Sequence, residues 1–354
     1  MTKEVKWLLS VIIICCVGFF FAAWSKAATP AATPSQKWPE QILIGSYPKV
    51  SASYPASIAL SQLTTKYTPS RGILKEFAGG GPGLTALGKG LIDIFSTGQW
   101  DHLEAYYGRP GSLWAGKPQN IRLMNYYYPG PTNSIGVRPG EGIEKVEDLA
   151  GKRVLTNVKF IPWGQRAHDL ILEFYGLKNK IKPLEITGFD QIADMMVDKR
   201  ADAFIFSTEG AYAMKIKASV GLKWLPLSEK CVEYVVSKME GFDKYRWAPY
   251  LLKMWGYPTD ATVYCTAYCF SNTVRADLPD HVVYGILDAL YADKHLDEVR
   301  NLAGYMHDVS LERACSGFWY PFHDGAVKYY KYRKVWTNEM EKHQKELLAK
   351  SRRQ

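Results

Sequence analysis

The sequence predicts an α/β protein of two lobes joined by a hinge, with a ligand cleft between the lobes. Two observations predict this fold. The order strand, loop, helix, strand occurs twice, once in each half of the chain. The chain has 354 residues, of which 47% are hydrophobic, and this is enough to fill two cores. Duplicate α/β units that direct loops and helix N-termini to one cleft typically bind a small molecule there.

The N-terminus has the three-part pattern of a secretory signal. Two lysines precede an uncharged run of 18 residues from Trp7 to Trp24, and the small residues Ser25 and Ala27 fit a cleavage site. We therefore expect residues 1–27 to be a signal peptide that exports the chain to the periplasm. An uncleaved anchor is the alternative, because 18 apolar residues lie at the lower limit for a membrane span.

The charge of the chain is basic. Cleavage would lower the formal net charge from +9 to about +7, because three lysines and one glutamate lie in the first 27 residues. A basic surface attracts acidic ligands or an anionic membrane surface, although a solvated basic tail at 350–353 is the simpler interpretation. We expect no nucleic acid partner.

The first half begins after residues 28–40, whose Ala, Pro, Thr and Ser content is typical of a linker. The hydrophobic pattern then predicts a strand at 41–45, a loop at 46–53, a helix from Tyr54 through Leu63, a strand at 72–78, a glycine-rich loop at 79–83, a helix at 84–90 and a strand at 92–96.

The second half repeats this order. It predicts a strand at 148–156, a loop to Trp163, a helix at 167–175, a strand at 184–187, a helix at 191–197 and a strand at 201–207. An apolar strand and long helices follow from Thr262, and a charged helix at 334–350 should pack on the outside. We therefore assign residues 41–133 and 261–354 to the first lobe and 134–260 to the second, with the crossovers as the hinge.

Four cysteines follow residue 27, at positions 231, 265, 269 and 315. An even number in an oxidising compartment permits disulfides. Cys265 and Cys269 lie in one predicted strand about 13 Å apart, so they cannot bridge each other. Either they pair with Cys231 and Cys315, in an order that the sequence does not give, or the thiols are free and buried.

The glycine-rich segment is similar to two nucleotide-binding motifs. From Gly83 to Lys89 the order is G-x-x-x-x-G-K, but Gly90 stands where a P-loop needs Ser or Thr to hold magnesium. From Gly81 to Ala86 the order is G-x-G-x-x-A, a weaker dinucleotide pattern that Pro82 stiffens. The better interpretation is that open backbone N–H groups at a helix N-terminus attract an anion such as a carboxylate.

Signatures of enzymes are missing from the sequence after residue 27, which has no G-x-S-x-G, H-E-x-x-H or C-x-x-C motif. Cys315 and His323 are close in sequence, but residues 321–325 are typical of a turn in which His323 caps or bonds the backbone. We therefore predict no catalytic residue, no metal site and no cofactor.

Aromatic residues make up 14% of the chain. Six lie on loops that should face the cleft: Tyr47, Tyr54, Trp100, Phe160, Trp163 and Tyr212. Most aromatic side chains pack in a core, but this concentration favours a pocket for a ligand with a hydrophobic or ring-bearing body beside its charged end.

Several segments together resemble the TAXI-type solute receptors of tripartite ATP-independent periplasmic (TRAP) transporters. Residues 320–331 are similar to the closing signature P-x-H-x-G-A-x-x-Y-Y, and residues 148–154 to the more widely shared D-L-x-G-K-x-V. Further matches are residues 201–207, residues 278–284, and the order of the glycine-rich loop, residues 90–93 and Gln99. Together these segments span residues 41–331.

The resemblance implies a periplasmic type II binding fold whose lobes close on a small ligand, often an amino acid or a dicarboxylate. It also implies delivery of that ligand to TRAP membrane permease subunits that use an ion gradient. Two pocket loops depart from the family, because residues 48–53 and 159–164 are bulkier than its glycine- and serine-rich runs. The usual glutamate-like ligand of the family is therefore in doubt.

We expect a clamp for a small organic anion or amino acid that bears a carboxylate. The ligand-binding residues expected in the first lobe are Tyr47, Ser51, Ser53, Tyr54, Gly80, Gly81, Gly83 and Gln99. Those expected in the second are Thr156, Asn157, Phe160, Trp163, Gln165, Arg166, Ser207 and Glu209.

Arg166, at a predicted helix start, is the expected carboxylate partner, with an exposed helix arginine as the alternative. Trp163 should cover the ligand as the lobes close. A receptor that serves a sensor kinase and an exported enzyme are the alternative functions. Neighbouring permease genes would separate the first from a transport receptor, and turnover of the bound compound would reveal the second.

Overall fold

The computed structural model describes residues 37–51, 53–158, 161–302, 306 and 309–351. The chain divides into two units, Met1–Trp38 and Pro39–Gln354, and every described helix and strand belongs to the second. None of these described helices is both long and apolar enough to cross a membrane. The predicted signal peptide lies outside the described residues.

The first sheet has six strands, β1 Gln41–Ser46, β2 Arg71–Glu76, β3 Ile94–Gly98, β4 Ile121–Thr132, β10 Phe242–Arg246 and β11 Tyr264–Arg275. Strand β1 is parallel to both of its neighbours, β2 and β3, as the predicted βαβ order requires. Strand β11 runs antiparallel to β3, β4 and β10.

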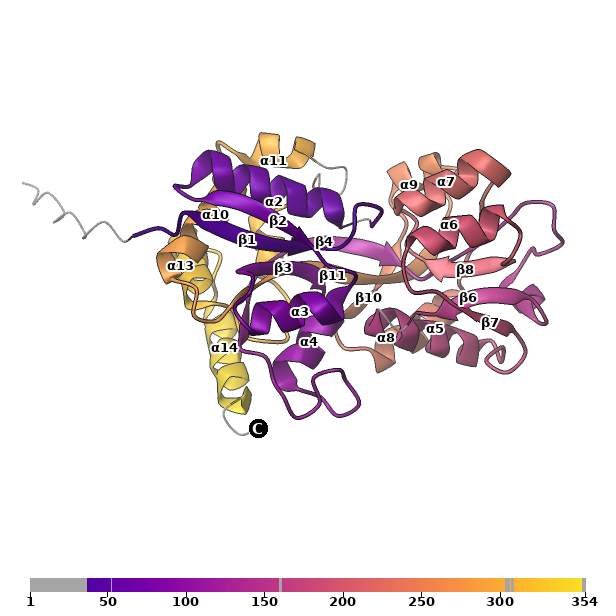
Figure 1. Cartoon of the computed structure of the whole chain (residues 1–354), viewed down its shortest axis with the longest axis horizontal. Helices are drawn as coiled ribbons and strands as arrows, with labels where there is room; N and C mark the ends of the chain where they lie inside the picture. The colour runs from indigo at the N-terminus through magenta and orange to yellow at the C-terminus, as the bar shows by residue number, and fades with distance from the viewer. Residues whose placement is uncertain (1–36, 52, 159–160, 303–305, 307–308, 352–354) are drawn as a thin grey trace, which may run out of the picture. The chain divides into compact units, whose positions relative to one another are not determined.

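Helices cover both faces of this sheet (Figure 1). On one face lie α2 Tyr54–Tyr67, α10 Asp280–Tyr291 and α11 Leu296–Leu302, and on the other lie α3 Gly80–Gly88 and α4 Gln99–Tyr107. Ile42 and Ile44, in strand β1 between β2 and β3, are 0% exposed. Such burial follows from helices on both sides of a parallel strand.

The second sheet has the order β7-β6-β8-β5-β9. Its strands are β5 Ser134–Val137, β6 Arg153–Asn157, β7 Lys182–Glu185, β8 Ala203–Phe206 and β9 Lys223–Leu225. The other elements of this region are the 3-10 helix η1 Val146–Leu149, α5 Pro162–Phe174, α6 Asp190–Val197, α7 Ala211–Val220, α8 Glu229–Lys238 and α9 Pro249–Met254. In Figure 1, α6 and α7 lie on one face of the sheet and α5 on the other. Two sheets, each covered by helices, confirm the predicted two-lobed α/β fold.

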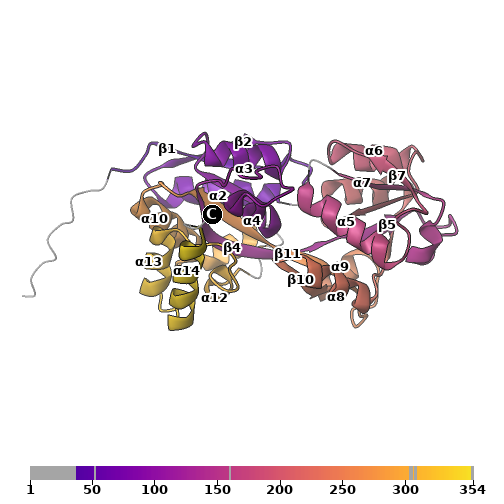
Figure 2. The ribbon, with the colours of Figure 1, turned by 90° about the horizontal axis from the view of Figure 1, so that it is seen from below.

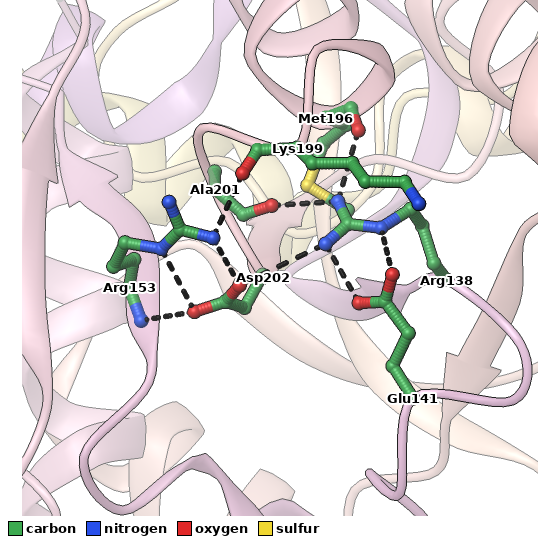
Figure 3. Close-up of polar contacts among 7 residues, drawn as sticks. All are labelled: Arg138, Glu141, Arg153, Met196, Lys199, Ala201 and Asp202. Atoms are coloured by element: carbon green, nitrogen blue, oxygen red, sulfur yellow. Dashed lines mark hydrogen bonds and ion pairs between the residues drawn. The ribbon is translucent and has the colours of Figure 1, made fainter.

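A network of charged side chains fixes one edge of the second lobe (Figure 3). Arg138, which is 4% exposed, donates to both carboxylate oxygens of Glu141 at 2.7 Å. It also donates to the backbone carbonyls of Met196 and Ala201, at 2.9 and 2.6 Å. Arg138 thereby ties the end of β5 to the segment between α6 and β8.

One residue separates the two sheets where β4 ends and β5 begins. This residue, Asn133, is buried and has a φ of +54°, a left-handed conformation that asparagine tolerates. Its side-chain amide donates to Thr266 Oγ1 at 2.7 Å, and Thr132 Oγ1 lies 3.0 Å from the same hydroxyl. The crossing is therefore a defined turn, in the position expected for a hinge.

Strand β10 departs from the predicted lobe boundary. We expected residues 134–260 to belong entirely to the second lobe, but residues 242–246 pair with β11 in the first sheet. The reason lies in β11, whose residues 270–274 pair with β3, whereas residues 264–268 need another partner for their backbone groups. Strand β10 supplies that partner.

The C-terminal signature builds the first lobe. His323 caps α13 Asp324–Tyr332, because its Nδ1 accepts from the Gly325 N–H at 3.1 Å, as the predicted turn requires. Phe322 exchanges two backbone hydrogen bonds of 2.9 Å with the Gln344 side chain in α14 Asn338–Ser351. Figure 2 shows α13 and α14 next to each other, with α12 Leu311–Ala314 close by.

Among the described side chains, Cys231, Cys265 and Cys315 are free and buried. Burial raises the pKa of each thiol to about 12, which keeps the thiols protonated and unreactive. Of the two alternatives that the sequence left open, free buried thiols are correct for these three. The side chain of Cys269 lies outside the described part of the chain.

Candidate ligand-binding site

A pocket lies where the two lobes meet, and both contribute to its wall. It encloses about 450 Å³ of space that no atom occupies, including its opening to solvent. The lining residues are Tyr47, Ser51, Ser53, Pro131, Thr132, Trp163, Phe189, Phe206, Ser207, Tyr212, Tyr268 and Phe270. Seven of these twelve are aromatic, and none has a charged side chain.

The aromatic rings contact one another across the two lobes. The centroid of the Trp163 ring, in α5, lies 4.5 Å from that of the Tyr268 ring, in β11, and the two rings meet edge to face. The Tyr47 ring, after β1, lies 6.2 Å from that of Phe189, which in turn stacks on Tyr212 at 6.1 Å. These separations lie within the range of favourable aromatic pairs, so the rings form two apolar clusters, each with rings from both lobes.

The polar part of the wall is small. The hydroxyls of Ser51 and Ser53 lie 3.3 Å apart and are 6% and 4% exposed as residues. Although Ser53 is the N-cap residue of α2, its hydroxyl makes no capping bond. Each hydroxyl can make three hydrogen bonds. These two therefore keep the capacity to bond a polar group in the pocket.

A buried carboxyl lies behind Tyr47. The Tyr47 hydroxyl is 2.7 Å from Thr97 Oγ1 and donates to Asp101 Oδ2 at 3.4 Å. Burial, together with the nearby Glu104, raises the pKa of Asp101 to about 8. The backbone N–H of Trp163, from the other lobe, faces this carboxyl and partly offsets the rise. The carboxyl thus links the two lobes just outside the pocket.

Five of the residues predicted from the sequence line this pocket: Tyr47, Ser51, Ser53, Trp163 and Ser207. Tyr54 begins α2 and Gln99 begins α4, and both lie outside the lining, as does the buried Thr156. Of Asn157 the structure describes only the backbone, in β6, and Phe160 lies outside the described residues.

The glycine-rich segment is not the open anion loop that the sequence predicted. Helix α3 already begins at Gly80, and side chains of the first lobe lie against Gly80 and Gly83. A Cβ atom at Gly80 would lie 2.1 Å from Asp101 Oδ2, and one at Gly83 would lie 2.1 Å from the Phe95 ring. Glycine is needed here for close packing within the first lobe.

Arg166 and Gln165 lie on a separate, open cavity. This cavity is also lined by Gly81, Trp100, Glu104 and Asp169, among others. Arg166 is exposed there, which agrees with the alternative interpretation of an exposed helix arginine. The Gln165 side chain accepts from the Val158 N–H at 2.9 Å and so holds the preceding loop. The expected carboxylate partner is therefore absent from the enclosed pocket.

Glu209 follows β8 and lies outside the lining. Its carboxylate accepts from the Tyr250 hydroxyl at 3.0 Å, and burial raises its pKa to about 7. Its backbone N–H donates to Ser207 Oγ at 3.3 Å. Glu209 thus supports a pocket residue without reaching the pocket wall.

The sequence did not predict four of the seven aromatic residues in the wall. Phe189, Phe206, Tyr268 and Phe270 were not selected, because a single aromatic residue beside a strand or helix is most often part of a core. One signal was available for the last two, since residues 268 and 270 alternate on one strand and so share a face. The loop before α6, which holds Phe189, carried no comparable signal.

The described residues contain no candidate metal site beside the pocket. Within them, no group of three or more His, Cys, Asp or Glu side chains could hold a metal ion. His102 and His168 are buried, and burial lowers their pKa values to about 3 and about 4. They act as neutral hydrogen-bonding groups within the two lobes.

Residues 44–332 match the model of the NMT1-like family. The chain belongs to the NMT1-like family. Within the NMT1-like family, the TAXI type and its TRAP transporter are finer distinctions than this match makes.

Solved structures with similarity to this NMT1-like chain include the periplasmic aliphatic sulphonate binding protein SsuA from Escherichia coli. It has 18% sequence identity and a TM-score of 0.46, over 84% of this chain and 89% of that one. PhnD1 from Prochlorococcus marinus, in complex with methylphosphonate, has 9% identity and a TM-score of 0.48, over 71% and 82%. A putative L-cystine ABC transporter from Listeria monocytogenes has 15% identity and a TM-score of 0.46, over 77% and 98%.

Proposed function

We propose that this protein is the periplasmic receptor of a TRAP transporter, which binds a small solute between its lobes and delivers it to membrane permease subunits. The pocket supports this proposal most strongly. Its described wall comes from both lobes and consists of aromatic rings, hydroxyl groups and a proline, which can hold a solute by packing and hydrogen bonds. A pocket formed by two lobes couples binding to closure, and closure gives a permease a shape to recognise.

The type of transporter is inferred from the sequence. The signature at 320–331 and the segment at 148–154 resemble those of TAXI-type receptors. The signature lies in the first lobe, where His323 caps a helix and the Tyr330 hydroxyl bonds the Met124 carbonyl at 2.8 Å. Its residues are outside the lining of the pocket, so the signature supports the assignment to this type of receptor through the architecture of the first lobe.

The receptor function is tested by recovering a solute from the protein. Native mass spectrometry of the purified protein should show an added small mass that denaturation releases unchanged. A compound recovered in altered form would contradict a receptor and favour an exported enzyme.

The transporter type needs a separate experiment. Permease subunits encoded beside this protein, reconstituted in vesicles, should take up the solute only with the receptor present and with an ion gradient across the membrane. Uptake that requires ATP instead would overturn the TRAP assignment and keep the receptor.

A further inference from the structure

We infer that the pocket selects an uncharged, ring-bearing solute whose polar group is bound by the hydroxyls of Ser51 and Ser53. This inference rests on the proposed receptor function and names the class of its ligand. It replaces the carboxylate-bearing ligand that the sequence predicted.

The described part of the pocket wall offers no charge to an ionic ligand. None of its twelve lining residues is Lys, Arg, His, Asp or Glu. The arginine expected to bind a carboxylate is exposed on another cavity. An ion moved from water into such a wall loses its hydration without gaining a partner, which is very costly.

Helix N-termini are the other device that binds anions, and at α2 and α7, which begin beside the pocket, some of the first N–H groups are absent or already bonded. In α2, the Tyr54 N–H bonds the Ser51 carbonyl at 3.4 Å, and Pro55 has no N–H. In α7, the Ala211 N–H bonds the Val50 carbonyl of the other lobe at 3.3 Å. At these two helix starts, fewer backbone donors therefore remain to replace a side-chain cation.

At the start of α5, one N–H is absent and the next faces a carboxyl of the protein. Pro162 has no N–H, and the N–H of Trp163 faces Asp101. An anion in the pocket would lie near this carboxyl, separated from it by Tyr47, and above the raised pKa of Asp101 the two negative charges would repel each other. The electrostatics of the site thus oppose an anion from two sides.

The remaining wall favours a ring. Tyr47, Trp163, Phe189 and Tyr268 present aromatic surface from both lobes, and such surfaces pack well against a flat ring. An amide, carbonyl or hydroxyl of the ligand can exchange hydrogen bonds with Ser51 and Ser53, whose hydroxyls bond only each other among the described side chains. A charge is unnecessary for this polar contact.

The test uses three probes that share a ring and differ in charge: phenylacetamide, phenylacetate and phenethylamine. After any co-purified solute has been removed by unfolding and refolding, each is titrated into the protein at pH 7, with calorimetry and the melting temperature as measurements. We expect phenylacetamide to bind at least about 10-fold more tightly than phenylacetate, because the carboxylate would be buried without a partner.

Two results would overturn the inference in different ways. Equal or tighter binding of phenylacetate or phenethylamine would show that the pocket accepts an ion, and the receptor function would stand. No binding of any probe would refute a pocket for rings, and the solute found by native mass spectrometry would then decide whether the receptor function survives.

A variant gives a further check of the electrostatic argument. Ser51→Lys adds an ammonium at the pocket wall, and we expect it to reverse the preference toward phenylacetate. Ser112→Lys makes the same change on the separate, open cavity and should keep the preference of the unmodified protein. Failure of Ser51→Lys to fold, seen by circular dichroism, leaves the comparison of probes on the unmodified protein as the deciding measurement.

Discussion

At the scale of single residues, Asp101 is the carboxyl beside the site whose surroundings most strongly disfavour the ionised form. It is 0% exposed, its Oδ2 receives only bonds of 3.4 Å from Tyr47 and Thr97, and its Oδ1 is buried without a hydrogen-bond partner in the described chain. Burial therefore raises its pKa to about 8, far above the value of 3.8 for a free side chain.

This pKa predicts how stability depends on pH. Between about pH 4 and pH 8 the folded state keeps the Asp101 proton while the unfolded state loses it, so stability falls as the pH rises. Asp101→Asn keeps the shape of the side chain, and the amide is uncharged without taking up a proton. We expect the free energy of unfolding of this variant to exceed that of the unmodified protein by at least about 1.4 kcal/mol at pH 8, the equivalent of one pKa unit. The difference should be much smaller at pH 5.

Urea unfolding at the two pH values measures this difference. Asp243→Asn, at an exposed position of β10, removes a carboxyl that stays in water in both states and should change little at either pH. A gain for Asp101→Asn that is the same at pH 5 and pH 8 would contradict the raised pKa.

Residues of the site were predictable from the sequence where a loop beside a predicted strand held a large or polar side chain, as at Tyr47, Ser53 and Trp163. Arg166 shows the limit of this reasoning. Its position near a helix start was predicted correctly, but the direction in which the helix turns it depends on how α5 packs, and that is a tertiary property.

At the scale of elements, the Arg138 network should contribute strongly to the second lobe. Its guanidinium is buried, donates to the Glu141 carboxylate and to two carbonyls, and lies 3.7 Å from the Asp202 carboxylate. Arg138→Met would leave these acceptors without a donor, so we expect a loss of about 3 kcal/mol in the free energy of unfolding. Thermal or urea denaturation measures the loss.

Arg153→Met is the matched control for this prediction. Arg153 also bonds Asp202, at 2.6 Å, but its side chain is 41% exposed, so water can replace the lost contact. We expect less than about 1 kcal/mol. Equal losses for the two variants would mean that burial of Arg138 has no special effect.

Elements were predictable wherever local pattern and long-range packing agree, as in β1, α2 and β8. The glycine-rich segment was predicted as a loop because glycine has a low helix propensity. Helix α3 nevertheless includes it, since the close approach of Phe95 and Asp101 to Gly83 and Gly80 requires residues without a Cβ. Tertiary packing outweighed the local preference there.

At the scale of the whole molecule, contacts between the lobes set the balance between open and closed states. The structure has such contacts at Trp163 with Tyr268, at Tyr47 with Phe189 and at the Ala211 N–H with the Val50 carbonyl. The turn at Asn133 joins the sheets between which these contacts form. The lobe assignment from sequence missed β10 because its partner in β11 lies outside the segment assigned to the second lobe.

Trp163 is the contact whose removal should shift this balance most. It is 5% exposed, touches Tyr268 and Phe242, and faces Asp101 through its backbone. Trp163→Ala removes the ring contacts of the closed state and has no comparable effect on an open one. We expect a larger radius of gyration by small-angle X-ray scattering, and at least about 10-fold weaker ligand binding, because fewer molecules are then competent to bind.

Trp100→Ala is the control. Trp100 lines the separate, open cavity, and the guanidinium of Arg109, which lies over its ring, belongs to the same lobe. That variant should keep the radius of gyration and the affinity of the unmodified protein. A Trp163→Ala variant that binds more weakly with an unchanged radius would mean that the ring contacts ligand without controlling closure. The ring would then belong to the pocket wall alone, and the closed state would depend on the remaining contacts between the lobes.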